Sequence, residues 1–194
     1  MNRAADVVLA GVGLALASPL LAAAALAIKL DDGGPVLFRQ VRVGKDGEDF
    51  ELVKIRSMKV GAEHTGAGYA IDAGDARITR VGRLLRRTSA DELPQLWNVL
   101  RGDMSVIGPR PTLRYQVDRY SERQRRRLEI RPGLTGWAQI NGRAALSWAE
   151  RIELDVWYVE HRTALLDLKI LLRTPFVLFG NTYRGSSGGW RPDR

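Results

Sequence analysis

The apolar positions near the N-terminus of the 194-residue chain run together without a break, whereas those farther along are spaced. Val7 through Ile28 is an uncharged stretch of 22 residues. As a straight helix it would reach about 33 Å, enough to cross the hydrocarbon core of a bilayer. The stretch therefore predicts a membrane helix. A cleaved signal peptide is the main alternative, but it fits poorly because Asp6 offsets the positive charge of Arg3.

Ser18-Pro19 lies in the middle of this stretch. A proline in a helix interior removes a hydrogen bond at a cost of about 3 kcal/mol, so a kink is expected there. Two topologies stay open: a kinked helix that spans the bilayer, and a re-entrant hairpin whose two arms of about 16 Å each reach roughly its middle. The flanking charges decide nothing, because Arg3 and Lys29 place one positive charge on each side.

The pattern beyond the membrane stretch is typical of an α/β head. After the breaker at 31–35, Val36–Val43 and Asp49–Ile55 predict two strands, and the Asp-Gly signal between them predicts a hairpin turn. Gly61–Asp75 is rich in glycine and has no period, which predicts a long loop. The loop is either an active-site lid or a connection.

Three later segments have helical spacing of their apolar positions. Ala76–Thr88 carries an apolar stripe beside five arginines, and Leu146–Arg162 and Leu165–Phe179 are amphipathic. The aromatic residues of the last two segments suit either a membrane interface or ordinary core packing. The chain as a whole is therefore expected to be α/β, mostly helical and membrane-associated, with a kinked N-terminal helix, a small β-hairpin and amphipathic interfacial helices.

Charge and composition narrow the chemistry. The formal net charge of +8 indicates an anionic partner, which can be nucleic acid, acidic lipid or a phosphorylated small molecule. The chain has no cysteine and two histidines far apart, His64 and His161. This composition disfavours thiolate zinc sites, cysteine nucleophiles and a serine-histidine triad. A second basic run, 113–131, lacks the aromatic ladder of a single-stranded nucleic-acid platform.

Two adjacent acids, Asp91 and Glu92, precede Pro94, which must lie in the first turn of any helix that follows. Acids at such a position can simply cap the backbone and complement the helix dipole, with Ser89 as an alternative capping residue. They can also act on a phosphate held at the helix N-terminus, because an aspartate with an ordinary pKa near 3.9 is ionised at neutral pH. An ionised aspartate can attack phosphorus without a general base.

Arg110 stands between two prolines, Pro109 and Pro111, which restrict the backbone on both sides. A guanidinium presented from a stiff loop suits bidentate binding of phosphate oxygens. A surface turn with an incidental arginine is the alternative.

Several motifs, in order along nearly the whole chain, resemble those of the bacterial sugar transferases called monotopic phosphoglycosyl transferases. They are Thr88-Ser89-Ala90-Asp91-Glu92-Leu93-Pro94-Gln95-Leu96, Gly102-Asp103-Met104-Ser105, Gly108-Pro109-Arg110-Pro111, Arg131-Pro132-Gly133-Leu134-Thr135-Gly136-Trp137-Ala138-Gln139, Asn141-Gly142-Arg143 and Asp155-Val156-Trp157-Tyr158-Val159. The chain resembles the small, core-only members of this family, since nothing but a few residues precedes Asp6.

The resemblance implies an activity: transfer of a sugar 1-phosphate from a UDP-sugar to a polyprenyl phosphate, with release of UMP, as the first step of a surface glycan. It implies that Asp91 is the nucleophile that carries a covalent phosphosugar and that Asp91 binds Mg²⁺, with Glu92 as the partner carboxylate. Arg86, Arg110 and Arg143 match the positions of phosphate and substrate contacts.

The resemblance also favours the re-entrant helix over the spanning one. It implies a membrane helix over 1–30 kinked at Ser18 and Pro19, a catalytic head with interfacial helices over 31–180, and a flexible tail over 181–194. The head is expected on the cytoplasmic face of the bacterial inner membrane, in contact with membrane lipid. Nucleic acid is not an expected partner, and a homodimer is compatible with the resemblance. The alternative function is a membrane-tethered basic module that binds anionic lipid or nucleic acid.

Overall fold

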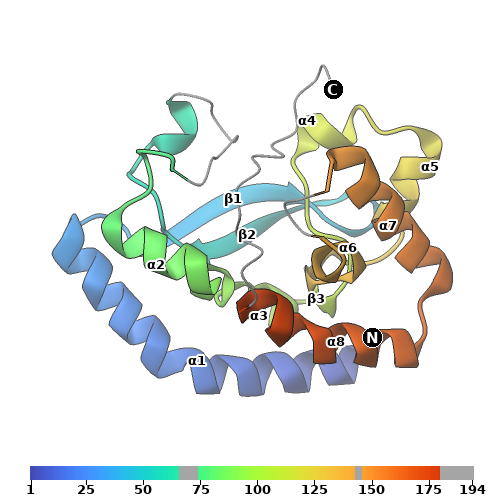
Figure 1. Cartoon of the computed structure of the whole chain (residues 1–194), viewed down its shortest axis with the longest axis horizontal. Helices are drawn as coiled ribbons and strands as arrows, with labels where there is room; N and C mark the ends of the chain where they lie inside the picture. Colours follow the sequence, from blue (N-terminus) through green and yellow to red (C-terminus); the bar gives the residue numbers. More distant parts are fainter. Residues whose placement is uncertain (66–73, 143–145, 180–194) are drawn as a thin grey trace.

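The computed structural model describes residues 1–65, 74–142 and 146–179. The described chain is mostly helical, with two separate two-stranded sheets (Figure 1). In chain order the elements are α1 (Arg3–Asp31), β1 (Leu37–Val43), η1 (Lys45–Gly47), β2 (Asp49–Ile55), η2 (Ala62–His64), α2 (Arg80–Thr88), η3 (Ala90–Glu92), α3 (Gln95–Arg101), β3 (Ser105–Ile107), α4 (Arg114–Val117), α5 (Glu122–Arg125), η4 (Arg126–Leu128), β4 (Gly133–Thr135), α6 (Trp137–Ile140), α7 (Trp148–His161) and α8 (Ala164–Phe179).

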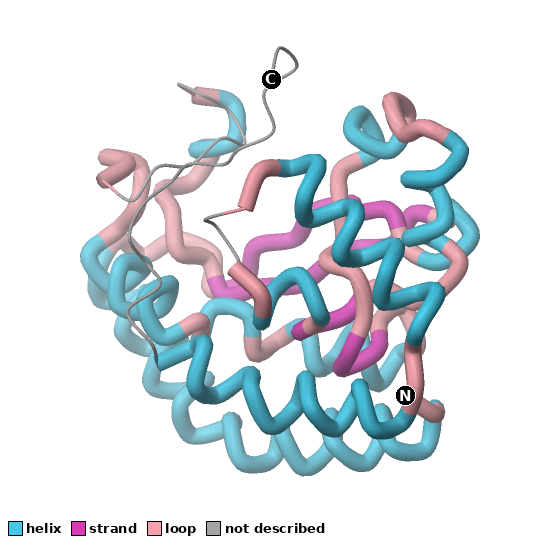
Figure 2. Tube along the Cα trace, turned by 45° about the vertical axis from the view of Figure 1, so that its right-hand side comes forward, coloured by secondary structure: helices cyan, strands magenta, loops and turns pink. Residues whose placement is uncertain are grey.

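Helices α1 and α8 form the base of the molecule. They run side by side along its lower edge in both Figure 1 and Figure 2, and Ala10 of α1 shares a core cluster with Ile170 of α8. Within the described residues, α1 is the helix that is long and apolar enough to cross a membrane, and most of it is not buried. Its apolar residues such as Leu16 and Leu30 are more than three-quarters exposed. The base of the molecule is therefore a largely apolar surface.

Both ends of α1 are fastened to the rest of the chain. Near the N-terminal end, the buried Asp6 carboxylate accepts hydrogen bonds from the Ser105 hydroxyl at 2.9 Å and from the Val106 amide at 2.8 Å. At the C-terminal end, Asp32 forms an ion pair with the buried guanidinium of Arg56. Burial of the Arg56 side chain strengthens this pair, because little water competes for it.

α1 contains Ser18-Pro19, the pair at which a kink is expected. The helix is continuous over Arg3–Asp31 with Pro19 inside it, while the ribbon of α1 changes direction near its middle (Figure 1). Pro19 has no N–H for the Ala15 carbonyl four residues before it. The Ser18 hydroxyl donates to that carbonyl at 2.8 Å. The orphaned acceptor is thus satisfied locally, as membrane helices that contain proline require.

The predicted hairpin is confirmed. Strands β1 and β2 pair antiparallel from Leu37 opposite Ile55 to Val43 opposite Asp49. The turn between them places Asp46 at φ 56° and Gly47 at φ 83°. Asp and Gly tolerate this left-handed backbone, which is why the Asp-Gly pair predicted the turn.

The predicted helices are present with shifted ends. The helix expected from Ala76 begins at Arg80, because Thr79 caps it by accepting a hydrogen bond from the Gly82 amide at 2.9 Å. Those expected at Leu146–Arg162 and Leu165–Phe179 are α7 and α8. The aromatic residues of α7 have two different environments. Tyr158 is buried in the core and its hydroxyl donates to Asp167 at 2.6 Å, whereas Trp157 is about one-third exposed.

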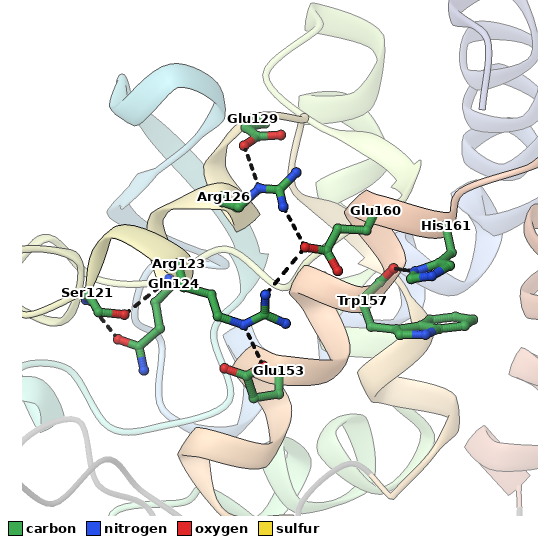
Figure 3. Close-up of polar contacts among 9 residues, drawn as sticks. All are labelled: Ser121, Arg123, Gln124, Arg126, Glu129, Glu153, Trp157, Glu160 and His161. Atoms are coloured by element: carbon green, nitrogen blue, oxygen red, sulfur yellow. Dashed lines mark hydrogen bonds and ion pairs between the residues drawn. The ribbon is translucent and has the colours of Figure 1, made fainter.

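The second basic run is largely neutralised within the molecule. Arg123 of α5 contacts Glu153 and Glu160 of α7, and Arg126 of η4 contacts Glu160 and Glu129, as Figure 3 shows. The ion pairs lie on the surface, where each contributes little to stability. This run therefore offers less positive charge to an outside partner than its sequence indicates.

Glycine contacts hold α2 against the strands. A Cβ at Gly82 would lie 1.9 Å from the Ser57 carbonyl oxygen, far inside van der Waals contact, whereas a Cβ at Gly11 of α1 would meet nothing within 4 Å. We expect Gly82→Ala to reduce the free energy of unfolding by about 3 kcal/mol through overpacking. Gly11→Ala is the matched control and should stabilise α1 by roughly 0.5 kcal/mol. Thermal unfolding followed by circular dichroism measures both, and equal midpoints for the two variants would contradict the close packing.

Candidate active site

Four separate segments bring charged side chains to one place above α1. Lys54 comes from β2, Arg86 from α2, Asp91 and Glu92 from η3, and Arg110 from the loop after β3. Contacts between β2 and η3, and between α2 and η3, bring these segments together. The structure thus unites the predicted residues Arg86, Asp91, Glu92 and Arg110. The predicted residue Arg143 lies outside the described residues.

Glu92 is the hub of the site. Its Oε1 lies 3.2 Å from Lys54 Nζ and also accepts from Arg110 Nη2, while its Oε2 accepts from Arg110 Nη1 at 3.3 Å. Although burial raises its pKa, Arg110 and Lys54 together hold the pKa of Glu92 well below its usual range. Glu92 is therefore an ionised carboxylate that fixes two cations beside Asp91.

Asp91 is the reactive candidate. Its side chain is buried, with 7% of the residue exposed, and no described residue forms a hydrogen bond or an ion pair with its carboxylate. Burial first and the neighbouring Glu92 second raise the pKa of Asp91, while Lys54, Arg86 and Arg110 oppose the rise. The sequence alone does not reveal this rise, because it does not show that the residue is enclosed next to a second carboxylate.

The capping interpretation of these acids is not supported. Ser89 adopts a left-handed conformation with φ 57° and makes no side-chain cap, and Pro94 rather than Asp91 is the N-cap of α3. The acids lie in the single 3₁₀ turn η3 before that helix. The left-handed Ser89 ends α2 as its C-cap, and the turn that follows places the buried Asp91 carboxylate before α3.

Lys54 is the residue of this site that the sequence interpretation missed. It stands among apolar residues of the second hairpin strand, and its side chain is 19% exposed. Burial lowers the pKa of Lys54, and Glu92 counteracts that effect. A lone lysine in an otherwise apolar strand segment was the available signal, because a buried lysine needs a carboxylate partner.

A buried network fixes the backbone of Arg110. The guanidinium of Arg127, on η4, donates through Nη2 to the Arg110 carbonyl at 2.9 Å and to Asp155 Oδ2, and through Nη1 to the Tyr120 hydroxyl. Arg127 and Asp155 are each 3% exposed at the side chain. Burial raises the pKa of Asp155 to about 6, although Arg127 opposes the rise. The loop of Arg110 is thus held from behind while the Arg110 side chain, 47% exposed, remains open to the outside.

Glycines hold the other side of the same loop. The Gly108 amide donates to Thr135 O at 2.9 Å, and the Gly133 amide donates to Pro109 O at 2.8 Å. A Cβ at Gly133 would lie 2.0 Å from the Gly108 nitrogen. The parallel pair β3–β4 and this glycine contact leave the loop with one backbone position.

The metal-binding capacity of the site rests on Asp91. The described residues contain no group of three or more His, Cys, Asp or Glu side chains that could hold a metal ion. A buried carboxylate without a hydrogen-bond partner is nevertheless a suitable oxygen ligand for a hard cation that also binds substrate phosphates and water. The donor set therefore fits Mg²⁺ carried with a diphosphate.

Comparison with known proteins gives one consistent family. The family model described as "Bacterial sugar transferase" matches residues 1–181. The uncharacterized sugar transferase EpsL of Bacillus subtilis is 51% identical over 147 residues, which are 76% of this chain and 71% of that protein.

Relatives with named substrates are similar over more of the chain. A UDP-glucose:undecaprenyl-phosphate glucose-1-phosphate transferase of Caulobacter vibrioides is 48% identical over 181 residues, 89% of this chain and 67% of that protein. A UDP-N-acetylgalactosamine-undecaprenyl-phosphate N-acetylgalactosaminephosphotransferase of Aeromonas hydrophila is 44% identical over 180 residues, 90% of this chain. The alignment covers only 42% of the Aeromonas protein.

Proposed function

Because the chain belongs to the bacterial sugar transferase family, we propose that it transfers a sugar 1-phosphate from a UDP-sugar to a polyprenyl phosphate and releases UMP. The observation that carries the proposal is the buried Asp91 next to a Glu92 held by Lys54 and Arg110. The printed names of the Caulobacter and Aeromonas relatives, both undecaprenyl-phosphate transferases that use UDP-sugars, support the same reaction. Such a transfer would begin the assembly of a surface glycan.

The reaction proceeds in two displacements at phosphorus. An Asp91 carboxylate oxygen attacks the sugar-bound phosphorus of the UDP-sugar, the bond from that phosphorus to the bridging oxygen breaks, and UMP leaves with the electron pair. A phosphate oxygen of the polyprenyl phosphate then attacks the same phosphorus, and the acyl-phosphate bond breaks to regenerate Asp91. The product is a polyprenyl diphosphate sugar. Lys54, Arg86 and Arg110 favour the ionised form of Asp91 against the effect of burial, and an ionised aspartate needs no general base for the first step.

The surrounding cations stabilise the charge of the diphosphate. Arg110 offers a planar fork from a fixed loop, and Lys54 and Arg86 add positive charge close enough to oppose the rise in the pKa of Asp91. Glu92 orients Arg110 and Lys54 before the substrate arrives. Arg143 is proposed as a further substrate contact on the resemblance alone.

Mg²⁺ is proposed as the cofactor, held by Asp91 together with substrate phosphates. When bound, it neutralises the diphosphate charge and makes phosphorus a better electrophile. Lys54 and Arg110, both paired with Glu92, would add to this neutralisation. The scarcity of histidine and the lack of cysteine suit an ion that prefers oxygen ligands.

We propose further that α1 enters and leaves the bacterial cytoplasmic membrane on one side, with the head in the cytoplasm. The fastening of Asp6 to Ser105 and Val106 and of Asp32 to Arg56 supports this, because both ends of the apolar helix contact the same head. The exposed apolar residues between those ends would lie in lipid. UDP-sugar from the cytoplasm and polyprenyl phosphate from the membrane would then meet at one face.

The topology predicts a labelling pattern. The natural chain has no cysteine, so single cysteines can be placed at Ala4, before the apolar stretch, and at Glu48, in the hairpin turn, both of which are exposed. In intact cells, a membrane-impermeant thiol reagent should label neither position, and permeabilised cells should show labelling of both. If the reagent labelled position 4 in intact cells while position 48 stayed unlabelled, α1 would span the membrane.

The Arg127–Asp155 pair predicts an acid limit on activity. As the pH falls through about 6, Asp155 takes up a proton and Arg127 loses the carboxylate that holds it against the Arg110 carbonyl. Asp155→Asn should mimic that state, with turnover lowered about tenfold or more and the limb near pH 6 removed from the pH–rate profile. Asp167→Asn, which alters another buried, hydrogen-bonded acid, is the control and should keep the limb. If Asp155→Asn kept the fall in activity near pH 6, that fall would belong to another titrating group.

The proposed function is tested by offering the full chain a panel of UDP-sugars with polyprenyl phosphate and Mg²⁺ and measuring UMP. We expect release with at least one UDP-sugar, and only with Mg²⁺ present. A basic module that merely binds anionic lipid or nucleic acid would release no UMP with any of them.

A further inference from the structure

Helix α2 presents a basic face that the proposed reaction does not use. Arg80, Arg83 and Arg87 are exposed and lie on one side of the helix around Leu84, which is 64% exposed. The spacing of three, four and seven residues keeps all four side chains on that side. Arg86 is off this face and lies close enough to Asp91 for its charge to oppose the rise in the pKa of that carboxyl. The basic face is thus separate from the active-site arginine of the same helix.

The charge of this face is not neutralised within the described part of the chain. No hydrogen bond or ion pair joins the side chain of Arg80, Arg83 or Arg87 to another described residue, and α2 contains no acid. The other surface arginine cluster behaves differently, because Arg123 and Arg126 contact three glutamates (Figure 3). Three exposed cations around an exposed leucine suit an anionic, partly apolar partner.

The place of α2 identifies that partner. Its opposite side packs on the C-terminal half of α1, where Leu85 clusters with Ala24 and Ile28. On the same half of α1, Leu26 and Leu30 are 62% and 79% exposed. If α1 lies in lipid, α2 is beside the point where α1 leaves it, which is the depth of lipid headgroups. Arginine side chains at that depth reach lipid phosphate groups through their long apolar stems.

We propose that the Arg80–Arg83–Arg87 face of α2 binds the headgroups of anionic phospholipids and so anchors the active-site side of the head to the membrane. The inference rests on the proposed membrane position of α1. A basic residue near an anionic membrane surface strengthens binding by about fivefold. The face therefore selects anionic over zwitterionic lipid, whereas the apolar surface of α1 has no such preference.

The test compares two lipids on the full chain in an uncharged detergent. Equal amounts of phosphatidylglycerol and phosphatidylcholine are added, the protein is isolated by size-exclusion chromatography, and the retained lipids are counted by mass spectrometry. We expect the wild type to retain phosphatidylglycerol over phosphatidylcholine about tenfold or more at low salt. The triple variant Arg80→Gln/Arg83→Gln/Arg87→Gln should retain the two nearly equally, with its thermal midpoint and retained phosphatidylcholine unchanged.

The matched control removes the same charge elsewhere. Arg123→Gln/Arg125→Gln/Arg126→Gln lies on α5 and η4 and should keep the preference for phosphatidylglycerol. Equal retention of both lipids by the wild type, or an equal loss in the two triple variants, would overturn the proposal. A raised KM for polyprenyl phosphate in the α2 variant with unchanged phosphatidylglycerol retention would also overturn it, by assigning the face to the substrate. Failure of UMP release in the wild type tests the proposed reaction instead and leaves lipid retention measurable.

Discussion

Asp91→Asn is expected to abolish sugar-phosphate transfer while the chain stays folded. The amide has nearly the same shape as the carboxylate but cannot attack phosphorus, and removal of a nucleophile of this kind costs roughly a thousandfold or more in turnover. The substitution also removes a buried negative charge beside Glu92, so it relieves like-charge repulsion rather than adding strain. Loss of activity with an unchanged thermal midpoint would therefore report on chemistry.

The covalent step can be observed directly. Wild-type protein incubated with its UDP-sugar and Mg²⁺, without polyprenyl phosphate, should gain the mass of one sugar phosphate in intact-protein mass spectrometry, and Asp91→Asn should not. Asp49→Asn removes an exposed carboxylate that pairs with Arg114 and is the control that should form the adduct normally. Normal turnover by Asp91→Asn, or an adduct on that variant, would refute the two-step mechanism.

Arg110→Lys should have the next largest effect, a loss of about a hundredfold in kcat/KM. Lysine keeps the positive charge but cannot form the two-pronged contact that Arg110 makes with Glu92 and would make with a diphosphate. Because the side chain is 47% exposed, the fold does not depend on it. Arg114→Lys, at another half-exposed arginine four residues on, is the matched control and should retain near-normal activity. Equal rates for the two variants would make the Arg110 loop structural.

Local chemistry explains which parts of the structure were predictable. The hairpin turn follows from the backbone freedom of Gly47 and the tolerance of Asp46 for positive φ, and the satisfied carbonyl of Ala15 follows from the Ser18 hydroxyl next to Pro19. Each depends on residues within four positions of one another. The predicted start of a helix was less accurate. The apolar spacing continues back to Ala76, whereas the Thr79 side chain caps the helix and makes it begin at Arg80.

The site was only half predictable for the same reason. Asp91, Glu92 and Arg110 belong to segments whose prolines and paired acids are unusual in themselves, and the structure brings Arg110 and Glu92 into contact. Lys54 contacts Glu92, which lies 38 positions later in the sequence, and Arg127 contacts Asp155, which lies 28 positions later. No periodicity within one element connects such partners, because their meeting is a property of the packed tertiary structure.

The hydrogen bond from the Ser18 hydroxyl to the Ala15 carbonyl can form early during synthesis on the ribosome. Residues 99–106, which receive Arg3 and Asp6 at the N-terminal end of α1, are made long after α1 itself. At a synthesis rate of about 5–20 residues per second, the apolar helix is complete several seconds before residues 99–106 are made. During that interval the Ala15 carbonyl already has its donor, the Ser18 hydroxyl three residues along the chain. The hydrogen bond beside Pro19 therefore needs no contact with the head, whose residues are made later.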